Sequence, residues 1–215
     1  MTKFDVKHTD TLLTTTRAVR KRLDLNRLVE EQQIIKCLEI SQQAPTGSNR
    51  QGWQWVIITD KGKRRIIANY YRQGAGNYLE EGKNSARDRG AEQDFKVFES
   101  AQYLADNMED VPLLVIPCID TSYMPLNAPG RKWLSLGGSI HPAIWSFQLA
   151  LRARGLGSCI TTLHLAYERE ISKIIGIPET FAQVALLPVA YTKGTDFKPA
   201  NRPPVSEIIH WNSWK

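Results

Sequence analysis

Hydrophobic residues recur at helical spacing in residues 27–43. The apolar side of this segment is formed by Leu28, Ile34, Ile35 and Leu38. Asn26 precedes the segment as a candidate N-cap, and Glu30 and Glu31 would lie near the positive end of the helix dipole. The pattern predicts an amphipathic helix.

A longer helical pattern covers residues 136–154. Its apolar stripe consists of Ile140, Ile144, Phe147 and Leu151. Glycines and alanines on its other sides would let it pack closely against several neighbours. Gly155 follows as a helix-ending residue, and a shorter helix is expected over residues 167–175, ending at Gly176.

Three segments have the composition of β-strands. Residues 53–59 are aromatic and β-branched and stop at a turn, whereas residues 112–119 are almost continuously apolar, as in a strand covered on both faces. Residues 184–191 form the third segment. Strands separated by helices predict an α/β layered domain with helices on both faces of a sheet.

No repeat or flexible linker divides the chain, so we expect a single domain over residues 1–215 with a variable insertion at about residues 61–135. Parts of this insertion have helical patterns, around residues 66–71 and 95–105. Residues 121–134 lack any period and are expected to form a surface loop or lid. Nothing in the insertion indicates a particular chemistry.

Composition limits the class of protein. With 42% hydrophobic and 23% charged residues, the chain has the composition of a globular domain. Its longest apolar stretch, residues 111–119, is about half of what a membrane-spanning helix needs. The N-terminal residues lack the apolar core of a secretory signal, so we expect a cytoplasmic protein with no membrane partner.

Cysteine content and charge narrow the possibilities further. Cys37, Cys118 and Cys159 are odd in number and far apart, which favours buried inert thiols over a disulfide framework, a metal site or a nucleophile. The formal charge is +6, with basic residues clustered at 17–22 and 61–65. No nucleic-acid-binding motif accompanies these clusters, so we expect no nucleic-acid partner.

Two basic segments are candidates for anion binding. Residues 14–22 hold three threonines followed by a cluster that includes Arg17 and Arg20. Guanidinium groups match phosphate oxygens, although a solvated basic helix end would have the same composition. Arg202 stands before Pro203 and Pro204, and it either faces an anion or is an ordinary exposed loop arginine.

Two polar segments are candidates for binding a planar ligand. In residues 44–53, the amides of Asn49 and Gln51 can pair with the edge of a heterocycle, although a plain turn has similar composition. Residues 155–164 leave a helix and enter an extended segment. Their two glycines do not form the dinucleotide-binding fingerprint, which needs three spaced glycines between a strand and a helix.

In this order and at these separations, the four segments resemble the nitroreductase family of flavin-dependent enzymes, which bind FMN at a homodimer interface. The similarity lies in an Arg-Arg-Ser-Val-Arg box, an Ala-Pro-Ser-x-x-Asn-x-Gln-Pro-Trp box, a Gly-Leu-Gly box and a C-terminal Arg-x-Pro. It spans nearly the whole chain, and the ordered set is what makes it specific. It implies a three-layer α+β fold, with a mixed, mostly antiparallel sheet between helices, in a homodimer.

The resemblance also implies roles for individual residues. Arg17, Ala18, Arg20 and Arg202 would hold the phosphate or ribityl chain. The flavin ring or ribityl chain would be contacted by Pro45, Thr46, Asn49 and Gln51, partly from the partner subunit. Thr161, Thr162 and Leu163 would lie beside the isoalloxazine and supply a donor near its N5. Thr16, Ala18 and Gly52 depart from the family pattern.

The resemblance implies a ping-pong oxidoreductase that uses NADH or NADPH to reduce an electron-poor acceptor such as a nitroaromatic or a quinone. The alternatives are a flavin-binding module without turnover and a specialised reductive dehalogenase or flavin-degrading enzyme. His164 and His141 are candidate proton donors, with a structural role as the alternative. The apolar residues 208–211 are expected to wrap onto the partner subunit.

Overall fold

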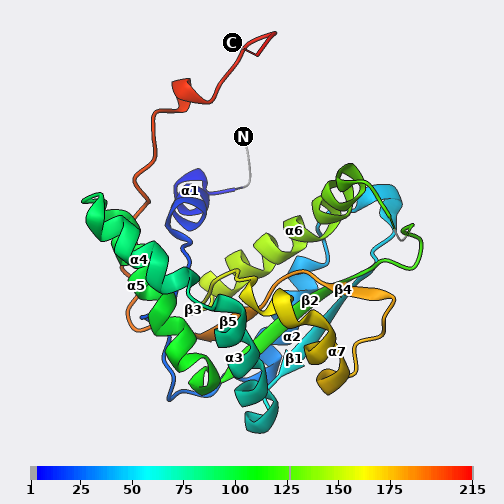
Figure 1. The fold of residues 1–215 in the computed structure, drawn as a ribbon. Helices are drawn as coiled ribbons and strands as arrows, with labels where there is room; N and C mark the ends of the chain where they lie inside the picture. Colours follow the sequence, from blue (N-terminus) through cyan, green and yellow to red (C-terminus); the bar gives the residue numbers. More distant parts are fainter. Residues whose placement is uncertain (1–3, 126, 215) are drawn as a thin grey trace.

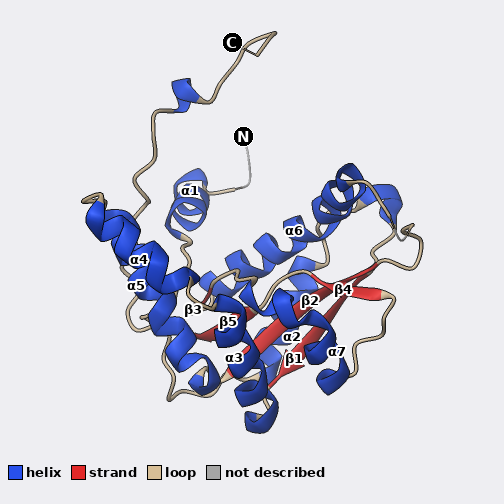
Figure 2. Ribbon diagram, in the orientation of Figure 1, coloured by secondary structure: helices blue, strands red, loops and turns tan. Residues whose placement is uncertain are grey.

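A five-stranded antiparallel sheet forms the centre of the fold. The computed structural model describes residues 4–125 and 127–214. The strands are β1 (Trp53–Ile58), β2 (Leu113–Asp120), β3 (Leu156–Ser158), β4 (Phe181–Gln183) and β5 (Leu187–Tyr191). Their order is β1-β2-β5-β3, and β4 pairs with the end of β2 that β5 leaves free. Figure 2 shows this sheet between helices.

Side chains of β2 alternate between two hydrophobic cores, one on each face of the sheet. Leu113 and Val115 pack with α2 (Glu31–Ser41) and α6 (Gly130–Arg152). Leu114 and Ile116 face the opposite core, built on the helices α3 (Lys61–Ala75), α5 (Glu92–Asn107) and α7 (Glu168–Ile175). Because both faces are covered, β2 is apolar at nearly every position. The expected helix–sheet–helix layering is confirmed, and every strand pair described is antiparallel.

The first predicted helix is shorter than expected. Helix α2 starts at Glu31 with Glu30 as its N-cap, so the proposal of Asn26 as the cap is wrong. The backbone N–H of Asn26 instead donates to the carboxylate of Asp24 (3.1 Å), which stabilises a turn before the helix.

Two other predicted boundaries also shift. Helix α6 begins at Gly130, directly after Pro129, so residues 130–134 of the expected loop are helical. Their apolar side chains Trp133 and Leu134 are exposed, which hides the helical periodicity. Strand β5 starts at Leu187, later than predicted, and the preceding Leu186 forms an isolated bridge with Thr161.

The insertion is more ordered than its sequence pattern indicates. It folds into α3, α4 (Tyr78–Asp88) and α5, with Gly76 and Gly90 in positive-φ turns between them. A side chain at Gly82 would lie 2.2 Å from the Phe98 ring, so this glycine lets α4 and α5 pack closely. Residues 121–125 and 127–129 form the surface turn that was expected there.

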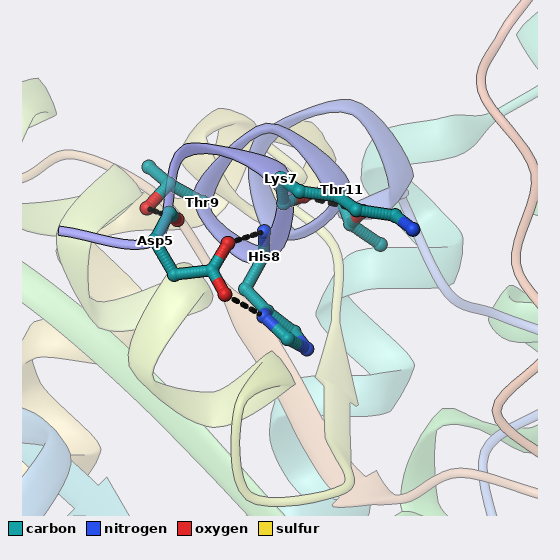
Figure 3. Close-up of polar contacts among 5 residues, drawn as sticks. All are labelled: Asp5, Lys7, His8, Thr9 and Thr11. Carbon is teal, nitrogen blue, oxygen red and sulfur yellow. Dashed lines mark hydrogen bonds and ion pairs between the residues drawn. The ribbon is translucent and has the colours of Figure 1, made fainter.

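Helix α1 (Val6–Thr15) was not predicted, and it stands outside the layered body together with the C-terminal segment (Figure 1). Local hydrogen bonds stabilise its start (Figure 3): the Asp5 carboxylate accepts from the His8 backbone N–H (3.0 Å) and contacts the His8 ring (2.6 Å). Thr9 donates to the Asp5 carbonyl. Within α1, the buried residue is Thr15, the last residue of the helix. Helix α1 is therefore attached to the body mainly at its C-terminal end.

Among the described residues, no helix combines the length and apolar content that crossing a membrane requires.

Candidate functional site

The structure brings the four residues predicted to hold a phosphate around one cavity. Arg17, Ala18, Arg20 and Arg202 line a cavity of about 450 Å³. Its lining also includes residues 196–201, the rest of residues 17–22, and Gln93 and Ser100 of α5. We call this cavity the basic cleft. Arg17 and Arg202 are 185 positions apart in the chain, so the fold, not the local sequence, assembles it.

The arginine segment is attached to the edge of the sheet. The Val19 backbone N–H donates to the Ser158 carbonyl of β3 (2.9 Å), and Leu23 pairs with Thr192. A side chain at Gly157 would lie 2.7 Å from the Thr192 Cγ2 atom and 3.0 Å from the Val19 Cβ atom. The glycine therefore allows the close approach that places Arg17 and Arg20 at the cleft.

The loop that carries Arg202 is held by an arginine–aromatic stack. Two guanidinium groups contact the Phe197 ring: that of Arg22 lies 4.2 Å and that of Arg152 4.5 Å from the ring centroid. Arg22 also donates to the Lys193 carbonyl (2.8 Å), and Arg152 donates to the Thr195 carbonyl (3.0 Å). These contacts fix the loop over residues 193–197, five residues before Arg202. The sequence did not indicate them.

The cations of the basic cleft are incompletely neutralised. Arg17 has no side-chain partner among the described residues, and Arg202 donates to the carbonyl of its own neighbour Asn201 (3.1 Å). Arg20 donates to Ser100 (3.4 Å). By contrast, Lys21 at the same cleft is paired with Glu99 (2.8 Å). The unpaired guanidinium groups are available to an anion.

The segment predicted to lie beside the isoalloxazine adjoins the basic cleft. Thr161 shares a hydrogen bond with the Tyr71 hydroxyl (2.8 Å). Burial raises the pKa of Tyr71, and the nearby Arg20 opposes this increase. Arg20 therefore lies close enough to affect the residue that contacts Thr161. A side chain at Gly74 would lie 2.0 Å from the Leu163 carbonyl oxygen, so α3 supports this segment closely.

Within this segment, the N–H groups of Thr162 and Leu163 are the candidate backbone donors, because neither has a backbone partner in the described part of the chain. The Thr161 N–H donates to the Leu186 carbonyl (3.1 Å), and the Leu186 N–H donates in return (2.8 Å). Thr161 cannot also supply a backbone donor to a ligand. The Thr162 N–H has no backbone partner in the described part of the chain, and its side chain is exposed.

The four residues predicted to contact the flavin from the loop after α2 lie elsewhere. In Figure 1, the turn η1 (Gly47–Asn49, light blue) lies beside the start of α6, far from the segment that follows α1. The Gly47 N–H donates to Ser139 of α6 (3.1 Å). The basic cleft and the cavity lined by Thr46 and Gln51 have no lining residue in common.

Within this loop, three of the predicted residues do come together. The Thr46 hydroxyl accepts from the Gln51 N–H (3.2 Å), and the Asn49 side-chain oxygen accepts from the Gln51 amide (3.0 Å). Pro45 precedes them and is exposed. Ser48, Asn49 and Gln51 have φ values of 54°, 51° and 49°, a left-handed conformation that costs energy for such residues. Backbone strain of this kind concentrates at functional loops.

The three cysteines and His164 are buried, and burial shifts their pKa values. Cys37, Cys118 and Cys159 are free and buried as predicted, and burial raises their pKa to about 11, 12 and 11. At neutral pH they are protonated thiols. His164 is fully buried and neutral, and His141 is exposed and contacts the Gly137 carbonyl (2.8 Å). The described residues contain no cluster suited to a metal ion.

The nitroreductase family model matches residues 13–191, which include the basic segment after α1, the loop after α2 and the Gly-Leu-Gly box. The chain belongs to the nitroreductase family. It is therefore an enzyme of a flavin oxidoreductase family, as the sequence predicts.

Similar proteins include iodotyrosine deiodinases. An iodotyrosine deiodinase from Thermotoga neapolitana is 24% identical over 197 residues, covering 88% of this chain and 92% of that protein. Oxidised iodotyrosine deiodinase bound to FMN and 3-iodo-L-tyrosine has a TM-score of 0.72 at 22% identity, covering 95% of this chain and 99% of that chain.

A nitroreductase-like protein from Bacillus cereus has a TM-score of 0.66 at 18% identity, with 98% of both chains covered. These structural likenesses confirm the predicted nitroreductase-type α+β fold.

Proposed function

We propose that this protein is an FMN-dependent oxidoreductase that uses NADH or NADPH to reduce an electron-poor acceptor such as a nitroaromatic or a quinone. The observation that supports it best is the basic cleft, where Arg17, Arg20 and Arg202 converge without full neutralisation beside the Thr161 segment. Three guanidinium groups at one cavity suit a dianionic phosphate.

The residues of the basic cleft fit the phosphate end of FMN. Arg17 and Arg202 would donate charge-assisted hydrogen bonds, with Arg20 and the backbone near Ala18 beside them. Lys21 and Arg22 are engaged with Glu99 and Asp196, so they would contribute positive potential more than direct bonds. In this proposal, the residues that would hold the phosphate are separate from those that would lie near the reacting ring.

Residues 161–163 would lie along the isoalloxazine. The Thr162 N–H is the proposed donor toward N5, because the Thr161 N–H is used by Leu186. The Thr161 hydroxyl is positioned by Tyr71. Bound FMN would supply the redox chemistry, accepting a hydride from the nicotinamide and passing the electrons to the acceptor. The two substrates would occupy the same pocket in turn, which predicts ping-pong kinetics.

We propose that the partner is a second copy of the chain. A flavin held in the basic cleft is far from Pro45, Thr46, Asn49 and Gln51 of the same chain, so those residues would reach it from the partner subunit. The exposed apolar segment 208–211 would cover part of that partner. We also propose that the protein resides in the cytoplasm, since three unpaired cysteines are typical of a reducing compartment.

A reductive dehalogenase is the second candidate function. It is favoured by the likeness to iodotyrosine deiodinases in both sequence and fold. The same cofactor would then act on a halogenated aromatic acceptor. The two candidates differ in the acceptor alone, so they are separated by supplying 3-iodotyrosine and a nitroaromatic to the same reduced protein and measuring product from each.

The first experiment is a visible absorption spectrum of the purified protein. The chromophore is then released by heat and identified by chromatography, and the spectrum is repeated anaerobically with NADH or NADPH. A yellow protein that releases FMN and is bleached by a nicotinamide would support the proposal. Resistance to both nicotinamides would favour a binding module without turnover. A colourless protein that cannot be reloaded with FMN would contradict the proposal.

The site assignment has its own test. Arg17→Ala and Arg202→Ala should each weaken FMN retention by about 1–3 kcal/mol, the usual contribution of a hydrogen bond to a charged group. Equilibrium dialysis or quenching of flavin fluorescence would measure the change. Arg169→Ala is the matched control, because Arg169 is an exposed arginine of α7 away from the cleft. Unchanged retention in both cleft variants would contradict the assignment.

A further inference from the structure

A small cavity beside the loop after α2 has a lining that the flavin assignment does not use. Its volume is about 280 Å³, and its walls include Arg50, Tyr123, Met124, Lys132 and Ser139. We call it the Arg50 pocket. Arg50 lies between Asn49 and Gln51, and Lys132 lies in the first turn of α6. Two cations from distant parts of the chain therefore share one small cavity.

The charge of the Arg50 pocket is unbalanced. No carboxylate is among its described lining residues, and Lys132 has no side-chain partner within the described part of the chain. The Arg50 guanidinium lies over the Tyr123 ring, 4.1 Å from its centroid. A cation–π contact holds a guanidinium in place without neutralising its charge, so its N–H groups remain available to an anion.

The acid that lines the neighbouring cavity, Asp120, is engaged with another partner. Asp120 lines an adjoining cavity of about 200 Å³, and its carboxylate accepts a hydrogen bond from the Ser122 N–H (2.8 Å). That hydrogen bond is the main reason why the pKa of Asp120 is lowered, with Arg50 a smaller influence. Arg50 and Asp120 form no ion pair in the described structure, so the arginine is oriented by Tyr123.

The Arg50 pocket is continuous with the candidate flavin residues. The adjoining cavity is lined by Thr46 and Gln51, and both cavities share Arg50, Tyr123 and Ser139. The hydrogen bond from the Gly47 N–H to Ser139 ties the loop to α6 along this shared wall. A ligand in the Arg50 pocket would therefore lie beside the loop that is proposed to touch the partner's flavin.

We propose that Arg50 and Lys132 bind the carboxylate of a small aromatic acceptor, with Met124 and Leu136 forming the apolar wall for its ring. This inference rests on the proposed function, because the position of the loop at the flavin makes the pocket an acceptor site. The volume lies just below the usual range of about 300–1,000 Å³ for ligand pockets. It suits one substituted ring better than a dinucleotide.

The test compares the binding of two matched probes by titration calorimetry. The probes are 4-nitrobenzoate and its neutral analogue 4-nitrobenzamide, added to the purified oxidised protein with its flavin content recorded. The wild type should bind the anion about tenfold more tightly, the effect of one charge-assisted hydrogen bond. Arg50→Gln and Lys132→Gln should each remove most of this preference. The control is Arg65→Gln, which removes the same charge from an exposed position on α3. This variant should keep the preference for the anionic probe.

Three results would overturn the inference. The first is equal affinity for the two probes in the wild type, and the second is an unchanged preference in both pocket variants. The third is an increase in the KM for NADH or NADPH in Arg50→Gln with the probe preference retained, which would assign the cations to the phosphates of the nicotinamide donor. The probe titration needs no turnover. A failed reduction assay would therefore contradict the proposed function, and the probe preference would still test the inference about the Arg50 pocket.

Discussion

His164 is a titratable residue that folding removes completely from solvent. Its side chain is fully buried, and neither ring nitrogen has a hydrogen-bonding partner in the described structure. Burial lowers its pKa to about 4, from an unfolded value near 6.5. The imidazole is therefore neutral at physiological pH and cut off from solvent. These properties favour the structural alternative over a role as proton donor.

This environment predicts a specific pH dependence of stability. The unfolded chain binds a proton at His164 more readily than the folded chain, so stability is complete above about pH 6.5. It should fall between pH 6.5 and 4, by about 3 kcal/mol in total, and level off below. Urea unfolding at pH 7.0 and 4.5 would measure the loss. His164→Leu should flatten this part of the curve, whereas a change at the exposed His141 should leave it intact. Identical slopes in wild type and His164→Leu would contradict the prediction.

At the residue scale, some features of the candidate site could be predicted from the sequence and others could not. The unpaired arginines and the Asn49–Gln51 loop were recognisable because their chemistry is carried by side-chain type in a local order. Phe197, Arg152 and Gly74 were missed for the opposite reason. Arg152 contacts a carbonyl 43 positions away, and Gly74 matters because the Leu163 backbone approaches it. Such roles depend on tertiary contacts that no local pattern encodes.

At the scale of elements, the close approach of β3 to the arginine segment has a testable consequence. Gly157→Ala would place a methyl group 2.7 Å from Thr192 and 3.0 Å from Val19, so the segment that carries Arg17 must shift. We expect a loss of about 1–3 kcal/mol in stability, as for other overpacked sites, together with weaker FMN retention. Urea unfolding and flavin titration would measure both.

The matched control is Gly130→Ala, because a side chain at Gly130 meets nothing within 4 Å. Weakened stability with unchanged FMN retention in Gly157→Ala would mean that β3 does not position the phosphate-binding residues.

Long, buried elements were easier to predict from the sequence than short or exposed ones. Strand β2 and the second half of α6 were recognised because long buried elements carry a full hydrophobic pattern. Strands β3 and β4 have three residues each, and they exist through their pairing with β5 and β2. Helix α1 buries one residue, Thr15, so it has no apolar stripe to detect. Its first turn depends on the hydrogen bonds of Asp5, a local signal that hydrophobic periodicity ignores.

At the scale of the whole molecule, the candidate site is divided between two sides of one chain. The basic cleft and the cavity beside the Asn49–Gln51 loop have no lining residue in common. The segments that leave the body are unusually apolar for solvent-exposed chain: Ile208, Trp211 and Trp214 are 70%, 79% and 89% exposed. Exposed apolar groups of this size mark interaction surfaces. The proposed homodimer, in which each subunit would complete the other's site, would account for both observations.

The C-terminal segment provides the sharpest test of that assembly. Truncation after Glu207 removes Ile208, Trp211 and Trp214, each contributing about 1.5–3 kcal/mol if its side chain is buried against the partner. We expect the truncated chain to dissociate at micromolar concentration and to lose FMN. Sedimentation velocity and the flavin-to-protein absorbance ratio would measure both. Replacing Asn212 and Ser213 by alanine in the full chain is the control, since it keeps the apolar side chains. A truncated protein that remains a stable, FMN-loaded dimer would show that the segment does not hold the subunits together.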